Sequence, residues 1–174
     1  MTGGPGIATS SVIFVSAHTG KKEVYLMDID GANVRQITKD QSISLGPKFS
    51  KDGNLVAYTS YKSGYPDVWI IDLINSNRRR VSFYPGVNSG ASFSPNGSQL
   101  ALTLSKDGNT ELYTISSSGG SPTRLTRTRG TEASPTWSPD GSTLAYISDD
   151  RGSPQLFTLP ASGGVAQRIN TSAS

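Results

Sequence analysis

Short apolar runs alternate with polar, glycine-rich stretches along the chain, and they return at a constant spacing. One run occurs four times, at positions 44 residues apart. Its copies begin at Val12, Val56, Leu100 and Leu144. Apolar runs this short, bounded by turn residues, are typical of buried β-strands. Alanine is the second residue of three copies, which predicts a strand packed between two neighbouring sheets with little room on one face.

Two further runs follow in each copy. The second run has an aromatic residue in the same column each time, at Tyr25, Trp69, Tyr113 and Phe157. A glycine between the first two runs predicts a hairpin turn with positive φ, at Gly20, Gly64, Gly108 and Gly152. The third run is mostly polar, which predicts the outer strand of each unit. It ends at Thr38, Ser82, Thr126 and Asn170.

A fourth run ends in a five-residue motif that occurs three times. We call it the marker motif, and its copies are Phe49–Gly53, Phe93–Gly97 and Trp137–Gly141. The last four residues, Ser-Pro-Asp-Gly in the third copy, predict a tight turn. We expect the aromatic residue at its start to pack between neighbouring units, together with the aromatic residue of the second run.

Four short antiparallel strands in about 44 residues are the size of one blade of a β-propeller. The sequence therefore predicts an all-β fold of about four such blades, because one blade cannot bury both of its faces alone. The marker motif occurs only three times, so the first blade is expected to lack its innermost strand, in an open or partial propeller. Residues 1–10 are expected to be an N-terminal linker remnant, and 11–174 the partial propeller. The predicted units are 11–45, 46–89, 90–133 and 134–174.

Composition agrees with many strands and turns. The 174 residues include 19 Gly and 10 Pro but no Cys, so neither a disulfide framework nor a thiolate metal site is available. The net charge is +3, with basic residues gathered at Arg78–Arg80 and at Arg124, Arg127 and Arg129. We interpret these as solvated strand faces and expect no nucleic-acid partner, a phosphate-binding surface being the alternative. No apolar run approaches a membrane span, and Met1–Gly6 has no signal-peptide pattern.

No set of residues points to catalysis, a cofactor or a metal. His18 is the single histidine and falls in a predicted polar turn, which leaves no Ser-His-Asp set to assemble. Asp28–Asn33 begins like a calcium loop but lacks the later ligands, so a hairpin turn is the simpler interpretation. Gly86–Gly90 leads into a strand rather than into a helix and is not a nucleophile elbow. We therefore predict a protein that is not an enzyme.

The segment Trp137–Tyr146, with Gly163–Gly164 downstream, resembles the WD40-like propeller repeats of the TolB family of the Tol-Pal system. Gly4–Ala8, leading into Val12–Val15, and Tyr25–Gly31 are similar to the start of that family's propeller. The resemblance implies a periplasmic, non-enzymatic protein-binding module, taken from a six-bladed propeller. Its implied partners are a Pal-like lipoprotein and colicin segments, bound at one mouth of the central channel.

By position, the resemblance assigns partner binding to the loops that lead into the strand with the marker motif. The candidate residues are Ser44, Leu45, Val87, Asn88, Ser89, Gly90, Thr131, Glu132, Ala133 and Ser134. His, Ala and Thr positions that matter in the family hold Val87, Gly90 and Ala133 here. Asn88 and Glu132 are the polar members to substitute first, and ordinary solvation of the loops is the alternative.

Three further interpretations stay open from the sequence. The chain could be the non-catalytic propeller domain of a prolyl-oligopeptidase-like hydrolase, which predicts a hydrolase domain encoded downstream. It could also be an engineered or truncated propeller fragment without a function of its own. Open blade edges are a further candidate interface, through which two chains would associate.

Overall fold

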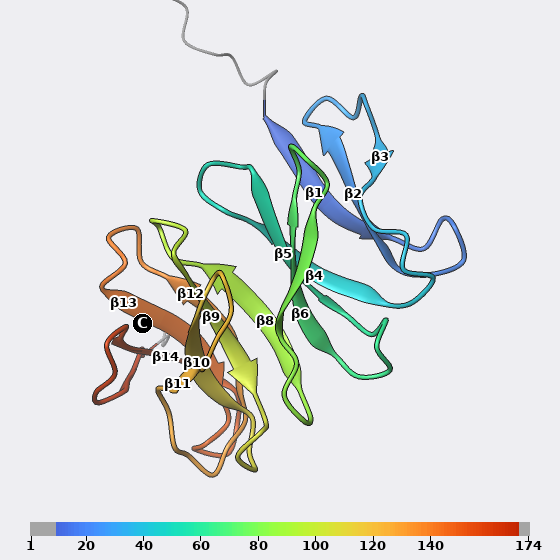
Figure 1. Ribbon diagram of the computed structural model, residues 1–174. Coiled ribbons are helices and arrows are strands. Elements are labelled where there is room, and N and C mark those ends of the chain that lie inside the picture. The colour runs from blue at the N-terminus through green and yellow to red at the C-terminus, as the bar shows by residue number, and fades with distance from the viewer. Residues whose placement is uncertain (1–9, 171–174) are drawn as a thin grey trace, which may run out of the picture.

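The computed structural model describes residues 10–170, and these form strands and turns without a helix (Figure 1). The strands build four antiparallel sheets, in each of which strands consecutive in sequence are neighbours. The first sheet contains β1 (Ser11–Ser16), β2 (Glu23–Asp28) and β3 (Arg35–Gln36). The second contains β4 (Ser44–Phe49), β5 (Leu55–Ser60), β6 (Asp67–Asp72) and β7 (Arg78–Ser82). The third contains β8 (Asn88–Phe93), β9 (Gln99–Leu104), β10 (Glu111–Ser116) and β11 (Thr123–Arg124). The fourth contains β12 (Glu132–Trp137), β13 (Thr143–Ser148), β14 (Gln155–Pro160) and β15 (Gln167–Arg168).

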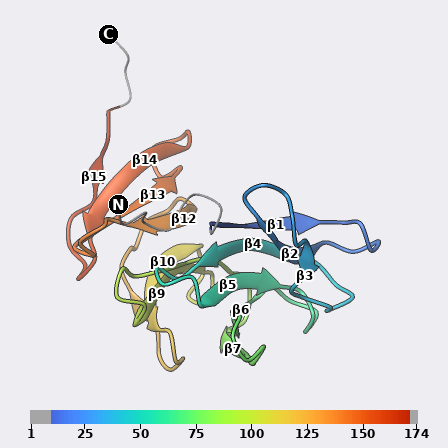
Figure 2. The same ribbon diagram turned by 90° about the horizontal axis from the view of Figure 1, so that it is seen from above.

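The four sheets stand side by side along an open arc. Figure 2 shows β4 and β12 toward the inner side of this arc, with β7 and β15 toward the outside. The all-β fold of partial-propeller blades is therefore confirmed, as is the three-stranded first sheet within residues 10–170. The predicted linker lies, except for Ser10, outside the described residues.

The inner strands begin two residues before the unit boundaries that the repeat suggests at 46, 90 and 134. Ser44 pairs with Ser60, Asn88 with Leu104, and Glu132 with Ser148. The aromatic marker alone does not reveal this extension, because an irregularity separates these pairs from the rest of the strand. Ser44, Asn88 and Glu132 thus belong to the sheets that follow them.

Three apolar clusters join the sheets in pairs. Each cluster includes the marker aromatic of the later sheet, so that Phe49, Phe93 and Trp137 all contribute to packing between sheets. The aromatic residues of the second run lie in the same clusters, as expected, with the exception of Tyr25, which stacks on Phe14 within its own sheet. Trp137 adds a polar contact, since its Nε1 donates to the carbonyl oxygen of Ser92 at 3.0 Å.

The marker motif recurs because its turn is held by side-chain hydrogen bonds. In each copy the serine hydroxyl accepts the backbone N–H five residues on, at 3.0 Å; the donors are Leu55, Gln99 and Thr143. The side chain two residues after the serine accepts a hydrogen bond from the serine hydroxyl. In the third copy, this bond from Ser138 lowers the pKa of Asp140 to about 2. The closing glycines have φ between 72° and 76°, which favours glycine there.

Each inner strand also has a bulge near its start. The pairing with the neighbouring strand shifts between Leu45 and Lys48, between Ser89 and Ser92, and between Ala133 and Thr136. A residue with positive φ lies in each interval: Gly46 at 58°, Gly90 at 67° and Ser134 at 54°. Two copies thus use glycine, whereas the third holds a serine in a conformation that L-residues seldom adopt.

We expect the exchange of residues between two bulges to change stability in opposite directions. Ser134→Gly should raise the free energy of unfolding by up to about 1 kcal/mol, because glycine adopts the left-handed backbone conformation at this position without the steric strain of a side chain. Gly46→Ser should lower it by roughly 1 kcal/mol for the converse reason. No atom lies within 4 Å of a Cβ placed at Gly46, so the cost there is conformational. Urea unfolding measures both, and shifts of the same sign would contradict the explanation.

Candidate protein-binding face

The loops divide between the two ends of the sheets. One end, which we call the connection face, holds the turns at 17–22, 61–66, 105–110 and 149–154 and the inter-sheet connections at 37–43, 83–87 and 125–131. The opposite end, the turn face, holds the turns at 29–34, 50–54, 73–77, 94–98, 117–122, 138–142 and 161–166. The predicted binding residues all lie at or next to the connection face.

Backbone hydrogen bonds fasten the start of each inner strand to turns on this face. Ser44 N–H donates to the Lys22 carbonyl at 2.7 Å, and Glu132 N–H donates to the Thr110 carbonyl at 2.9 Å. In the third sheet, Ser105 N–H donates to the Val87 carbonyl at 3.1 Å. A scaffold that holds loops in this way is a common basis for a binding surface.

Charge is distributed unequally between the two faces. Within residues 10–170, loops of the connection face hold eight cationic and four anionic side chains. The cations are Lys21, Lys22, Lys39, Lys62, Lys106, Arg127, Arg129 and Arg151, and the anions are Asp40, Asp107, Asp149 and Asp150. Loops of the turn face contain only Asp30, Lys51, Asp52 and Asp140. The loops of the connection face therefore have a net positive charge, which suits an acidic partner.

The predicted site residues differ greatly in exposure. Ser44, Asn88 and Glu132 are fully buried. Thr131 and Ser134 are exposed, and the remaining five candidates are half-buried: Leu45, Val87, Ser89, Gly90 and Ala133. The structure therefore brings them to one face, but it places the two polar residues selected for substitution inside the protein.

Asn88 organises the connection between the second and third sheets. Its Oδ1 accepts the Ser82 hydroxyl at 2.8 Å and the Tyr84 N–H at 2.9 Å. Its Nδ2 donates to the carbonyl oxygens of Tyr84 and Gly86, at 2.6 and 3.4 Å. The side-chain amide of Asn88 thus provides hydrogen bonds that backbone groups cannot provide within so tight a connection.

Glu132 forms a buried acidic pair with Glu111. Its Oε1 accepts the hydroxyls of Thr128 and Ser148, at 2.8 and 2.9 Å, while Glu111 Oε1 accepts Arg124 Nη2 at 2.8 Å. The Oε2 atoms of both residues are buried without a partner among the described residues. Burial, helped by the nearby Glu111 carboxyl, raises the pKa of Glu132 to about 6, although the hydrogen bonds from the two hydroxyls lower it. A proton on Glu132 could be donated to Glu111 and would satisfy both orphaned oxygens.

Three of the basic residues interpreted as solvated are ion-paired to buried carboxylates: Arg78, Arg124 and Arg80, the last of which stays exposed beside Asp67. Arg78 Nη2 lies 2.8 Å from Asp40 Oδ1, and its guanidinium also donates to the hydroxyl of Tyr58. Arg124 is bound to Glu111, and the side chains of Arg78 and Arg124 are only 22% exposed. The solvated interpretation is therefore wrong for Arg78 and Arg124, because buried carboxylates hold their side chains against the protein; Arg127 and Arg129 are exposed as expected. Burial raises the pKa of Tyr58 to about 12, although Arg78 opposes the shift.

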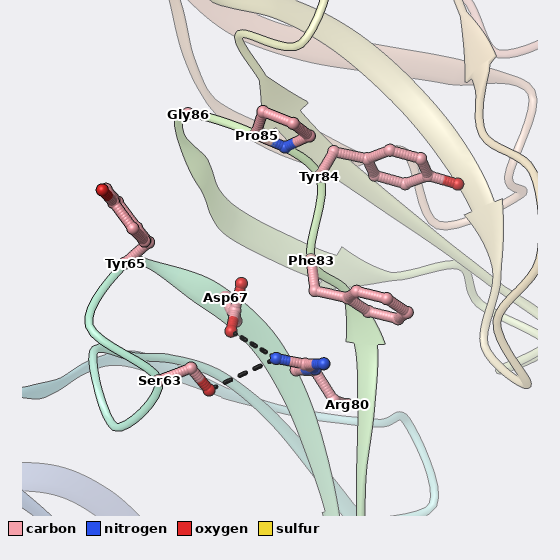
Figure 3. A pocket seen from close by; sticks show the side chains of 8 residues that line it. All are labelled: Ser63, Tyr65, Asp67, Arg80, Phe83, Tyr84, Pro85 and Gly86. Atoms are coloured by element: carbon pink, nitrogen blue, oxygen red, sulfur yellow. Dashed lines mark hydrogen bonds and ion pairs between the residues drawn. The ribbon is translucent and has the colours of Figure 1, made fainter.

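A pocket of about 470 Å³ opens on the connection face, beside the connection to the third sheet. Ser63, Tyr65, Asp67, Arg80, Phe83, Tyr84, Pro85 and Gly86 line it. Figure 3 shows Tyr65 on one side and Phe83 on the other, with Arg80 bonded to Asp67 and Ser63. This pocket was not predicted from the sequence. The sequence feature that could have indicated it is a difference between repeats: lysine, arginine or other polar residues occupy the positions of Tyr65 and Phe83 in the other repeats.

Residues 10–170 contain no group of three or more His, Cys, Asp or Glu side chains arranged to hold a metal ion. They also contain no helix long and apolar enough to cross a membrane.

Comparison with known proteins points to one family. The model of the family described as the TolB beta propeller domain matches residues 1–174. The Tol-Pal system protein TolB of Desulfosudis oleivorans is 48% identical over 61 residues, which are 35% of this chain and 14% of that relative. The crystal structure of TolB from Acinetobacter baumannii superposes with a TM-score of 0.85 at 27% identity, covering 96% of this chain and 43% of that one. The chain thus spans less than half the length of these relatives. Puromycin hydrolase, with a TM-score of 0.69 at 12% identity over 94% of this chain and 28% of that one, shares the fold alone.

We expect Asn88→Ala to act on stability rather than on a partner contact. The substitution leaves the buried Ser82 hydroxyl and the Tyr84 N–H without their acceptor. The free energy of unfolding should therefore fall by roughly 2 to 4 kcal/mol. Ser89→Ala, at the half-buried neighbouring position, is the control and should cost less than about 1 kcal/mol. Equal losses for the two variants in urea unfolding would contradict a buried anchoring role for Asn88.

Glu132 should make stability depend on pH in a defined window. Its pKa rises from 4.5 to about 6 on folding, so the folded state binds the proton more tightly. Its contribution is present below pH 4.5 and is lost as the pH rises through about 6, by between about 1 and 2 kcal/mol. Glu132→Gln keeps an acceptor for the two hydroxyls and adds a donor toward Glu111. The variant should lack this fall and exceed the wild type in stability at pH 8; parallel pH profiles of unfolding would refute the assignment.

Proposed function

Because this chain belongs to the TolB beta propeller domain family, we propose that it is a non-enzymatic protein-binding module of a Tol-Pal system, working through its connection face. The family match extends over the whole chain, and this observation is the main support for the proposal. The proposed partners are a Pal-like lipoprotein and colicin segments. The proposed location is the periplasm, where such partners would meet it.

The charge of the connection face supports protein binding there. Cationic side chains outnumber anionic ones two to one in its loops, whereas the loops of the turn face contain a single lysine. Complementary charge speeds the encounter with an acidic partner and excludes basic competitors. The face is also rigid at its centre, because the inner strands are bonded to the neighbouring turns.

The predicted residues divide into two roles in this proposal. Exposed Thr131 and Ser134, with the neighbouring Arg129, would contact the partner directly. Buried Ser44, Asn88 and Glu132 would act indirectly, by fixing the backbone of the three connections. A partner would then contact backbone groups and short side chains on loops whose conformation is fixed by these buried residues.

The hydrolase alternative has weaker support. Its structural neighbours among peptidases are related at identities that establish only a shared fold. The propeller of such an enzyme would also depend on a second domain for its chemistry, and fold alone does not transfer function. We therefore retain the binding module as the proposed function.

Calorimetric titration with a Pal-type domain lacking its lipid anchor tests the proposal. We expect saturable binding to the wild-type chain that weakens about tenfold in Arg129→Glu, because the substitution reverses a charge beside the predicted loop. Lys51→Glu makes the same charge change on the turn face and should bind like the wild type.

Equal weakening in both charge-reversal variants would contradict binding at the connection face. If no Pal-type domain binds, the titration is repeated with the full-length protein that contains this chain. The absence of binding there as well would refute the proposed partner.

A further inference from the structure

The pocket of Figure 3 has the features of a separate binding site for a peptide. Tyr65 and Phe83 are 71% and 57% exposed, although aromatic side chains of this size are usually covered. The guanidinium carbon of Arg80 lies 4.2 Å from the ring centre of Phe83, and Arg80 Nη1 is 3.2 Å from the buried Asp67. The floor of the pocket is thus ordered, while its aromatic walls remain open.

The internal repeats provide a control for this arrangement. At the position of Tyr65 the other sheets have Lys21, Asn109 and Ser153, and at that of Phe83 they have Lys39 and Arg127. Pro85 likewise corresponds to Gln41 and Arg129. The blade fold therefore does not require apolar residues here. Tyr65, Phe83 and Pro85 are thus apolar residues at positions that are polar in the other repeats, and all three line one pocket. The requirements of the blade fold do not explain why they occur together.

The polar part of the pocket indicates the charge of the occupant. The hydrogen bonds of Arg80 to residues in the range 10–170 all use Nη1, which leaves Nε and Nη2 to serve an incoming acceptor. Lys62 is exposed in the same turn as Ser63, and the surrounding face is positive. Asp67, the only carboxylate among the described residues that line the pocket, is already engaged by Arg80.

We propose that this pocket binds an extended acidic peptide segment of a partner protein, with apolar or proline side chains packed on the exposed rings of Tyr65 and Phe83 and a carboxylate on Arg80. Aromatic walls suit an extended, proline-containing backbone, and a guanidinium suits a carboxylate. The volume of about 470 Å³ accommodates one or two side chains rather than a folded domain. The site goes beyond the proposed function, because it lies on the outer side of the loops assigned to the Pal-like partner.

Fluorescence anisotropy with two labelled peptides of about ten residues tests the proposal. One peptide alternates glutamate with proline, leucine and phenylalanine, and the other has lysine in place of every glutamate. We expect the acidic peptide to bind saturably, less tightly as salt increases, and the basic peptide not to bind. Phe83→Lys and Tyr65→Asn should each weaken binding at least about tenfold, since both remove a wall of the pocket.

The variants are chosen so that folding is preserved. They introduce residues of the kinds that other repeats already hold at these positions. In the third sheet a cation, Arg127, occupies the position of Phe83, next to Arg124 at the position of Arg80. Ile74→Ser is the matched control, because Ile74 is 77% exposed on the turn face and serine occupies its position in the third and fourth sheets. It should bind the acidic peptide like the wild type.

The outcomes separate this inference from the proposed function. Loss of peptide binding in Phe83→Lys, with binding retained in Ile74→Ser, supports the pocket whether or not a Pal-type domain binds. Unchanged peptide binding in Phe83→Lys, or equal binding of the basic peptide, overturns the inference even if a Pal-type domain binds. Saturable binding of a short oligosaccharide that Phe83→Lys abolishes, without peptide binding, also overturns it.

Discussion

The whole structure depends on the burial of each sheet face by the next sheet. Leu112 in the third sheet is fully buried because the fourth sheet covers it. Leu156 occupies the same place in the fourth sheet, where no described sheet lies over it, and it is 36% exposed. Identical strand positions thus differ in burial only through their neighbour. A blade is consequently stable as a member of an array, whereas a single blade would leave its apolar faces exposed to water.

The connections between sheets meet a second constraint, and each copy meets it with different chemistry. A chain that turns from an outer strand into the next inner strand leaves buried polar groups near that strand's first residue. Ser44, Asn88 and Glu132 occupy this place and are all fully buried. A hydroxyl, an amide and a carboxyl each bond the residue four positions earlier, or its backbone. The carboxyl solution is the most costly, since burial next to Glu111 raises the pKa of Glu132.

Periodicity was enough to predict the blades, the turns and the packing role of the marker aromatics. Those features repeat because every copy meets the same physical demand, and a demand repeated three or four times is visible in one sequence. The burial of Asn88 and Glu132 was not predictable in this way, since polar residues in a loop suggest exposure unless their partners are known. The bulge was hidden for a related reason. Gly46 and Gly90 suggest a left-handed residue, but Ser134 breaks the pattern while keeping the conformation.

The demands shared by all blades also indicate where a repeat protein can acquire a binding site. Positions that serve the array must stay alike, so a new function is easiest to build where copies are free to differ. Exposure by itself is a poor guide, because single apolar residues such as Ile74 are common on protein surfaces. Tyr65, Phe83 and Pro85 differ from this case, since they come from two loops and surround one ordered ion pair. Convergence of several departures from the repeat, rather than any one of them, therefore distinguishes a site from neutral variation.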